Sequence, residues 1–198
     1  MGCILFKDND LEFIYTHFEP YGANRVFPCF DQPNLKAKMK LSIVTPKNWA
    51  AISNMPALNE DFLDKNKYKL NAKFEHAPSK DMLEKYLENI NEEEVKMTLF
   101  DYTQYLSTYV YAVCVGEFAW LPADESKAKV PMRMYCVPES GMMLGAYSDF
   151  IVDVVTKAMA YFEELFGTPY PFPKYDMIWV RDYANWAMEN AGIVTFNE

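Results

Sequence analysis

The chain ends with the residues Trp186-Ala187-Met188-Glu189-Asn190-Ala191-Gly192-Ile193-Val194-Thr195-Phe196-Asn197-Glu198. They predict a turn that carries one carboxylate, Glu189, followed by a short apolar β-strand. In that strand the apolar Val194 and Phe196 alternate with Thr195 and Asn197, which is the period of a half-buried strand. Since a strand needs partners, we expect a domain that continues past residue 198.

The composition is that of a folded, acidic protein. A length of 198 residues suits one large or two small domains, and 51% hydrophobic with 16% aromatic residues are enough for a packed core. The net charge of −9 argues against nucleic acid or an anionic membrane surface as a partner. It favours a cationic ligand such as a protonated amine, although acidity also serves solubility alone.

Neither a membrane span nor a disulfide framework is indicated. No apolar run approaches the roughly 20 residues that a span needs, and residues 1–6 are too short for a secretory signal. The cysteines are scattered without a CxxC pair, at Cys3, Cys29, Cys114 and Cys136. Buried thiols in a reducing compartment are the simplest interpretation, so we expect a cytoplasmic protein.

The first two thirds of the chain predict an antiparallel β domain. Runs of β-branched and aromatic residues, separated by Pro, Asn and Asp clusters, predict strands over 11–18, 37–44, 67–74, 95–102, 108–118 and 130–137. A polar segment over 79–91 has apolar residues at helical spacing and Ser79 as a cap, which predicts a surface helix. We therefore expect an all-β sandwich or similar double sheet over residues 1–138.

The pattern changes after residue 138. Apolar residues recur at three- and four-residue steps over 143–165, which predicts an amphipathic helix that Gly167 and Pro169 end. An extended connector over 169–173 and a strand over 177–180 then lead to the terminal segment. Residues 139–198 are therefore expected to start an α/β domain.

Without any family, the chain is poor in catalytic sets. Its two histidines, His17 and His76, are far apart in sequence, and no HExxH, GxSxG or phosphate-binding glycine loop occurs. Glu19, just before Pro20, and Glu189 differ from the other acids because each lies in an aromatic or apolar neighbourhood. Two interpretations are open, since a carboxylate in such a setting needs a cation or several donors. Each acid pairs locally, with Arg25 or Arg181, or both meet one cation across a cleft.

Several blocks of the sequence resemble the aminopeptidase N family of zinc metallopeptidases. The segment Thr16-His17-Phe18-Glu19-Pro20, with 23–33 after it, resembles that family's Thr-Gln-Phe-Glu-Pro block and its sequel. The segment Ala187-Met188-Glu189-Asn190 is similar to its Gly-Ala-Met-Glu-Asn signature. Further matching blocks lie at 107–118, 130–135 and 166–176.

The resemblance implies a saddle-like β domain packed on a thermolysin-like catalytic domain, with a peptide bound between them by its free amino terminus. By position, Glu19 and Glu189 would hold the α-ammonium of that peptide. The backbone of Trp186, Ala187 and Met188 would line the scissile peptide like an added strand, next to Asn190.

Two residues depart from the family pattern. Trp186 stands where the signature has glycine, so its side chain is expected to crowd the first substrate residue or to alter the backbone. His17 stands where the family has a glutamine that positions the amine. A neutral imidazole can accept a hydrogen bond from that amine, whereas a protonated one would repel it.

The resemblance implies a zinc-dependent aminopeptidase as the complete protein, releasing amino-terminal residues from peptides. Catalytic zinc needs three protein ligands, and we expect the zinc-binding helix to lie beyond Glu198, in the remainder of the catalytic domain. This chain would then supply the amino-terminus clamp, bind no metal and have no catalytic residue or activity of its own. The alternatives are a non-catalytic module that binds peptide amino termini and an inactive remnant.

Overall fold

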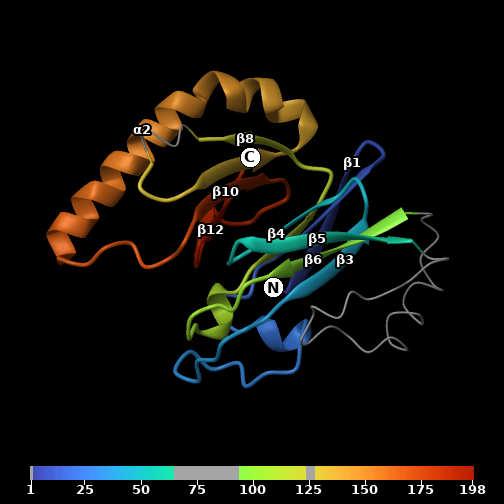
Figure 1. Cartoon of the computed structure of the whole chain (residues 1–198), viewed down its shortest axis with the longest axis horizontal. Coiled ribbons are helices and arrows are strands. Elements are labelled where there is room, and N and C mark those ends of the chain that lie inside the picture. Colours follow the sequence, from blue (N-terminus) through green and yellow to red (C-terminus); the bar gives the residue numbers. More distant parts are fainter. Residues whose placement is uncertain (1, 65–93, 124–127) are drawn as a thin grey trace.

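The computed structural model describes residues 2–64, 94–123 and 128–198, which form three β-sheets and one long α-helix (Figure 1). The predicted strand over 67–74 and the predicted helix over 79–91 lie outside these residues. The first sheet has the antiparallel order β1 (Cys3–Asp8), β2 (Leu11–Thr16), β7 (Val113–Gly116) and β4 (Ala50–Ser53). The second has the antiparallel order β3 (Ser42–Pro46), β6 (Glu94–Phe100) and β5 (Ala57–Asp64).

The third sheet is mixed and has a helix on one face. Its order is β11 (Ala187–Asn190), β12 (Ile193–Asn197), β10 (Tyr175–Val180), β9 (Met132–Cys136) and β8 (Ala119–Pro122). The central strand β10 is parallel to β9 and β12, whereas the two edge strands pair antiparallel. Helix α2 (Gly141–Phe166) connects β9 to β10, as a parallel pair requires. The predicted fold class, antiparallel β sheets followed by the start of an α/β unit, is confirmed.

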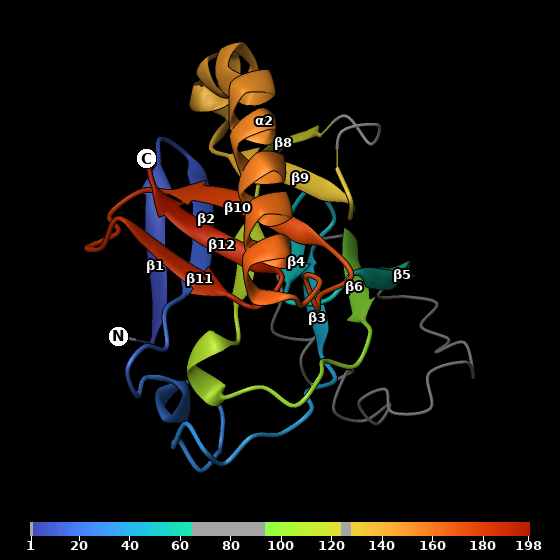
Figure 2. The same cartoon turned by 90° about the vertical axis from the view of Figure 1, so that its left-hand side faces the viewer.

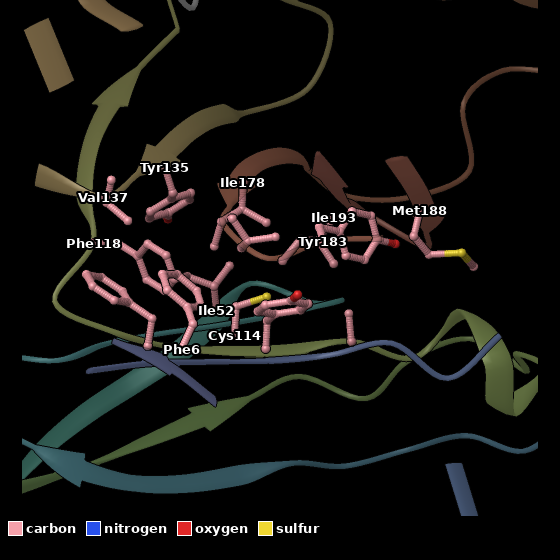
Figure 3. Close-up of a cluster of buried hydrophobic side chains, with 14 residues drawn as sticks. Phe6, Ile52, Cys114, Phe118, Tyr135, Val137, Ile178, Tyr183, Met188 and Ile193 are labelled. Atoms are coloured by element: carbon pink, nitrogen blue, oxygen red, sulfur yellow. The ribbon is translucent and has the colours of Figure 1, made fainter. Parts of the chain in front are cut away.

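Two apolar cores hold the layers together. In the first, side chains of β1, β2, β4 and β7 meet side chains of the third sheet, including Tyr135, Ile178, Met188 and Ile193 (Figure 3). In the second, the opposite face of the third sheet packs against Leu144 and Val152 of α2, which crosses that face (Figure 2). Because each buried large apolar side chain contributes about 1.5–3 kcal/mol, these two cores hold the first sheet, the third sheet and α2 together.

Helix α2 forms where the periodicity predicts it. Gly167 has φ of 62° and ψ of 24°, a left-handed conformation that ends the helix. The apolar surface of α2 is broader than the sheet covers, since several of its large apolar side chains are exposed: Met142, Met143, Tyr147, Phe150, Tyr161, Phe162, Leu165 and Phe166.

Two predicted strands are shorter than the sequence suggested. In the segment 108–118, Thr108–Val110 is a 3₁₀ helix and only Val113–Gly116 is a strand. The Thr108 hydroxyl donates to Asp31 Oδ1 at 2.6 Å, a tertiary contact that overrides the strand propensity. In the segment 37–44, Ala37 makes only an isolated bridge to Leu106, and the strand begins at Ser42.

The terminal segment also differs from the prediction. Residues Ala187–Asn190 form strand β11 instead of a turn, and they pair with β12 from Ala187 opposite Phe196 to Asn190 opposite Ile193. The turn of this hairpin is Ala191–Gly192. Strand β12 is buried on both faces because Ile193 joins the first core and Phe196 packs on the second. The prediction that this terminal strand is half-buried was therefore wrong.

The predicted domain boundary at residue 138 stays a prediction. Strands β8 and β9 precede that boundary, yet both belong to the five-stranded sheet that β10, β11 and β12 complete. The chain therefore crosses from the first sheet to the third between β7 and β8.

The hairpin turn is tightly fitted against the first sheet. Gly192 has φ of 74°, and a Cβ added there would lie 2.4 Å from the carbonyl oxygen of Asn54. Both the backbone angle and this close approach require glycine. The Asn54 amide donates to the carbonyls of Ala191 and Val110, at 2.8 Å each, and its Oδ1 accepts from the Ala112 N–H at 3.0 Å.

A buried ion pair holds the turn from the other side. The Lys174 ammonium donates to the Gly192 carbonyl at 2.9 Å and lies 2.8 Å from the Asp176 carboxylate. Burial lowers the pKa of Lys174, and the Asp176 charge opposes that shift. The turn is thus fixed to β4 and to the start of β10 at once.

We expect Gly192→Ala to destabilise the chain by about 3 kcal/mol, because left-handed backbone costs alanine about 1–2 kcal/mol and the clash with Asn54 adds about 1–3 kcal/mol. Urea unfolding measures this value. Gly167→Ala is the matched control, since Gly167 has φ of 62° but a Cβ there meets nothing within 4 Å. It should cost only about 1 kcal/mol. Equal losses in the two variants would contradict the tight contact at Gly192.

Candidate functional site

Glu19 lies shortly after the end of β2 at Thr16, and β2 is an inner strand of the first sheet. The residues before it, Thr16, His17 and Phe18, are buried, whereas the Glu19 side chain is exposed. Phe18 belongs to the same buried cluster as Ala191 in the hairpin turn. The strand end that carries Glu19 therefore packs beside the hairpin that carries Glu189.

Glu189 lies on β11, an edge strand of the third sheet. Side chains alternate along this strand. Met188 and Asn190 are buried, whereas Glu189 is exposed and Ala187 is partly exposed. Hence Met188 anchors the strand in the first core, and Glu189 is directed away from it. Trp186, just before the strand, is 93% exposed, and its carbonyl accepts from the Asn197 N–H at 3.0 Å.

The two carboxylates both affect the pKa of Tyr183. Its phenol is 5% exposed, and burial is the largest cause that raises its pKa. Glu189 and Glu19 both raise this pKa further, while the nearby Thr195 hydroxyl offsets part of the rise without reaching hydrogen-bond geometry. Both carboxylates thus act on the same buried phenol, which agrees with the packing of Phe18 beside Ala191 of the hairpin turn.

His17 lies next to the same phenol. Its ring centroid is 5.2 Å from that of Tyr183, and the His17 side chain is 1% exposed. Within the described residues, neither ring nitrogen of His17 has a hydrogen-bond partner, and the hydroxyls of Tyr183 and Thr195 and Oδ1 of Asn190 also lack one. Burial lowers the pKa of His17 below 6.5, and the Glu19 charge opposes this. His17 is therefore neutral at neutral pH.

Arg181 is not the partner of Glu189, so local pairing of these two is wrong. The Arg181 guanidinium binds Asp8 at 2.5 Å, Glu198 at 2.5 Å and Glu139 at 3.4 Å. Pairing of Glu19 with Arg25 stays a prediction. Arg181 thus ties β1, the segment before α2 and the end of β12 together, away from the Glu189 side chain.

Tyr183 and Asn54 are the residues that sequence reasoning missed. An aromatic residue between a strand and a hairpin is typical of core packing, so only the three-dimensional arrangement shows that Tyr183 packs against the His17 ring and that both acids raise its pKa. Asn54 stands in a Ser-Asn-Met-Pro stretch that resembles an ordinary turn. No signal in one sequence would have identified either.

The arrangement is suited to binding a cation. Two exposed carboxylates attract a positively charged group, and the neutral imidazole beside Tyr183 offers an additional acceptor. Among the described residues, no group of three or more His, Cys, Asp or Glu side chains could hold a metal ion. The residues present thus do not form a zinc site. In the part of the chain that the structure describes, no helix is long and apolar enough to cross a membrane.

Comparison with known families identifies two segments. Residues 5–81 match the peptidase M1 N-terminal domain, and residues 150–198 match the peptidase family M1 domain. The first match includes strands β2 and β4 and Glu19, and the second covers most of α2 and the hairpin that carries Glu189. Both halves of the candidate site therefore come from segments of one family.

Known relatives are similar over almost the whole chain. "Aminopeptidase M1-D" of Oryza sativa subsp. japonica is 32% identical over 98% of this chain, and "Aminopeptidase 2, mitochondrial" of Saccharomyces cerevisiae is 33% identical over 91%. "Probable M1 family aminopeptidase 1" of Encephalitozoon cuniculi is 32% identical over 97%. The chain spans 18%, 15% and 19% of the lengths of these three relatives. Because segments of the chain match both M1 domains in the same order, the chain belongs to peptidase family M1.

Proposed function

We propose that the complete protein is a zinc-dependent aminopeptidase and that this chain supplies the clamp for the substrate's amino terminus. The observation that carries the proposal is the packing of the strand end that carries Glu19 beside the hairpin that carries Glu189, through Phe18 and Ala191. The aminopeptidase names of the relatives support the reaction class. The substrate class is a peptide with a free amino terminus.

The clamp selects chain ends by charge. An α-amino group has a pKa near ~8, so it is largely cationic at neutral pH, whereas internal peptide bonds carry no charge. Two carboxylates bind that cation and leave internal segments unanchored. Fixing the amine also fixes which carbonyl reaches the reacting centre, so that residues are removed one at a time.

The position of strand β11 supports this proposal, because β11 is an edge strand. Among the described residues it pairs with β12 on one side, and its other edge bounds the sheet. A peptide that adds along Trp186, Ala187 and Met188 would extend the sheet by one strand, beside Glu189 and Asn190. The exposed Trp186 indole would then lie next to the first substrate residue and restrict its size.

The buried His17 imidazole is the third member of the clamp. Both ring nitrogens are buried and lack a partner among the described residues, so a hydrogen bond accepted from the substrate ammonium would satisfy one of them. Because His17 is neutral, it does not compete with that ammonium for the two carboxylates.

The metal and the catalytic residues belong to the remainder of the catalytic domain in this proposal. Zinc would supply Lewis-acid activation of water in the complete protein. This chain alone binds the amino terminus without cleaving the peptide, and we place it in the cytoplasm. A non-catalytic module that binds peptide amino termini is the second candidate, favoured by the poor fit of the described residues to zinc.

We expect a tripeptide with a free α-amino group to bind the chain more tightly than its N-acetylated twin, which lacks the charge. Glu19→Gln and Glu189→Gln should each reduce affinity for the free amine about five- to tenfold, measured by calorimetry. Glu12→Gln is the matched control, because Glu12 is an exposed glutamate of β2 that pairs with Lys7. Equal affinities for the two peptides would refute the clamp.

His17 should make stability depend on pH. Since its pKa in the folded chain lies below 6.5, the unfolded chain takes up the proton first as pH falls. This contribution to stability is complete above pH 6.5 and is lost as pH falls from there through the folded pKa. His17→Gln should flatten the free energy of unfolding in that window. An unchanged pH profile would show that His17 is not buried as a neutral ring.

The purified chain should contain no stoichiometric zinc, since the ligands are expected elsewhere in the complete protein. Elemental analysis after dialysis tests this expectation. One tightly held zinc per chain would contradict the assignment of the metal to the remainder of the catalytic domain.

A further inference from the structure

A cavity of about 630 Å³ lies between the first and third sheets, apart from the clamp. Its walls come from β4 and the residues after it, from β6, and from the facing parts of β8, β9 and β10. Among its described lining residues are none of the seven assigned to the amino-terminus clamp. The volume falls in the range of about 300–1,000 Å³ that is typical of small-molecule sites.

The charged side chains that line this cavity are mainly cationic. Lys96, Arg133 and Lys174 line it together with one carboxylate, Asp176. Lys174 and Asp176 neutralise each other at 2.8 Å, so Lys96 and Arg133 add positive charge beyond that pair. Lys96 is only 8% exposed, which places its charge where water screens it weakly. Both residues also make other contacts within the chain, and a ligand would add to these.

One wall of the cavity is apolar and aromatic. Ile52, Phe100, Trp120 and Tyr135 contribute to it. The Arg133 guanidinium lies over the Trp120 ring, 5.3 Å from its centroid. Stacking of this kind holds the planar group in one orientation, so its donors are arranged in advance for an oxyanion.

We propose that this cavity binds a small organic oxyanion, with Arg133 and Lys96 holding the anionic group and the aromatic wall packing against an apolar body. A carboxylate and a phosphate monoester share this chemistry. A cation is disfavoured by the lining charges, and a neutral apolar ligand would make no charge-assisted hydrogen bond with Arg133 or Lys96. The inference is independent of the clamp, because it uses different residues and an opposite charge.

The position of Lys174 gives the site a second property. Its ammonium lines the cavity and also donates to the Gly192 carbonyl, which holds the hairpin that carries Glu189. An oxyanion in the cavity therefore lies beside the contact that docks the hairpin on the first sheet.

Calorimetric titration of the chain with phenyl phosphate, benzoate and neutral benzyl alcohol tests the proposal. We expect at least one of the two anions to bind with a dissociation constant below about 1 mM and the alcohol not to bind. Tighter binding of phenyl phosphate would identify a phosphate monoester, and tighter binding of benzoate a carboxylate. Binding of the alcohol as tight as that of the anions, or no binding of any of the three probes, would overturn the proposal.

Variants locate the binding. Arg133→Gln should reduce the affinity for the anion about tenfold, and Arg133→Lys should reduce it less. Arg133 is exposed, so neither change should affect folding, which circular dichroism verifies. Lys157→Gln is the control, because Lys157 is an exposed cation of α2 that pairs with Asp153. Equal affinities of Arg133→Gln and the unmodified chain would refute the assignment, as would equal losses in Arg133→Gln and Lys157→Gln.

Discussion

The contact between the turn Ala191–Gly192 and the end of β4 determines where the candidate site forms. Asn54 binds the Ala191 carbonyl and Lys174 binds the Gly192 carbonyl, so the hairpin is held from both sheets at once. A two-stranded hairpin is marginally stable by itself, and an edge strand such as β11 would otherwise be free to fray. Because the turn is docked, Glu189 is fixed relative to Glu19, which lies on the other sheet. A clamp of this kind loses little conformational freedom when a ligand binds.

The buried Lys174–Asp176 pair contributes to specificity more than to stability. Removing two charges from water costs about as much as their attraction returns, so such pairs are weak sources of net folding energy. The geometry that such a pair requires is strict, however. The Lys174 ammonium has to find both the Asp176 carboxylate and the Gly192 carbonyl, which only one placement of the hairpin allows. The first core supplies the stabilisation, and this polar contact selects the register in which the two sheets meet.

Local patterns predicted the long elements, and tertiary contacts decided the short ones. Helix α2 and its end at Gly167 followed from apolar spacing and a left-handed glycine, both of which are properties of neighbouring residues. In contrast, Thr108–Val110 has strand-like residues but forms a 3₁₀ helix, because its side chains and carbonyls bind partners far away in sequence. For the site, the aromatic or apolar neighbourhoods of Glu19 and Glu189 singled out these two acids and left open whether they pair locally. The shared effect on Tyr183 depends on the packing of two sheets, which no periodicity encodes.

The partners of Arg181 explain why Glu189 keeps its charge available. Arg181 is close to Glu189 in sequence, and an ion pair between them would neutralise one half of the clamp. Instead, the guanidinium is surrounded by Asp8, Glu139 and Glu198, and its hydrogen bond to Glu198 raises the pKa of Arg181 above the ordinary value. With three acids around one cation, a fourth carboxylate would gain little there. The same cluster joins β1 to the end of β12, so the contact that keeps Arg181 away from Glu189 also fastens the two sheets whose junction forms the site.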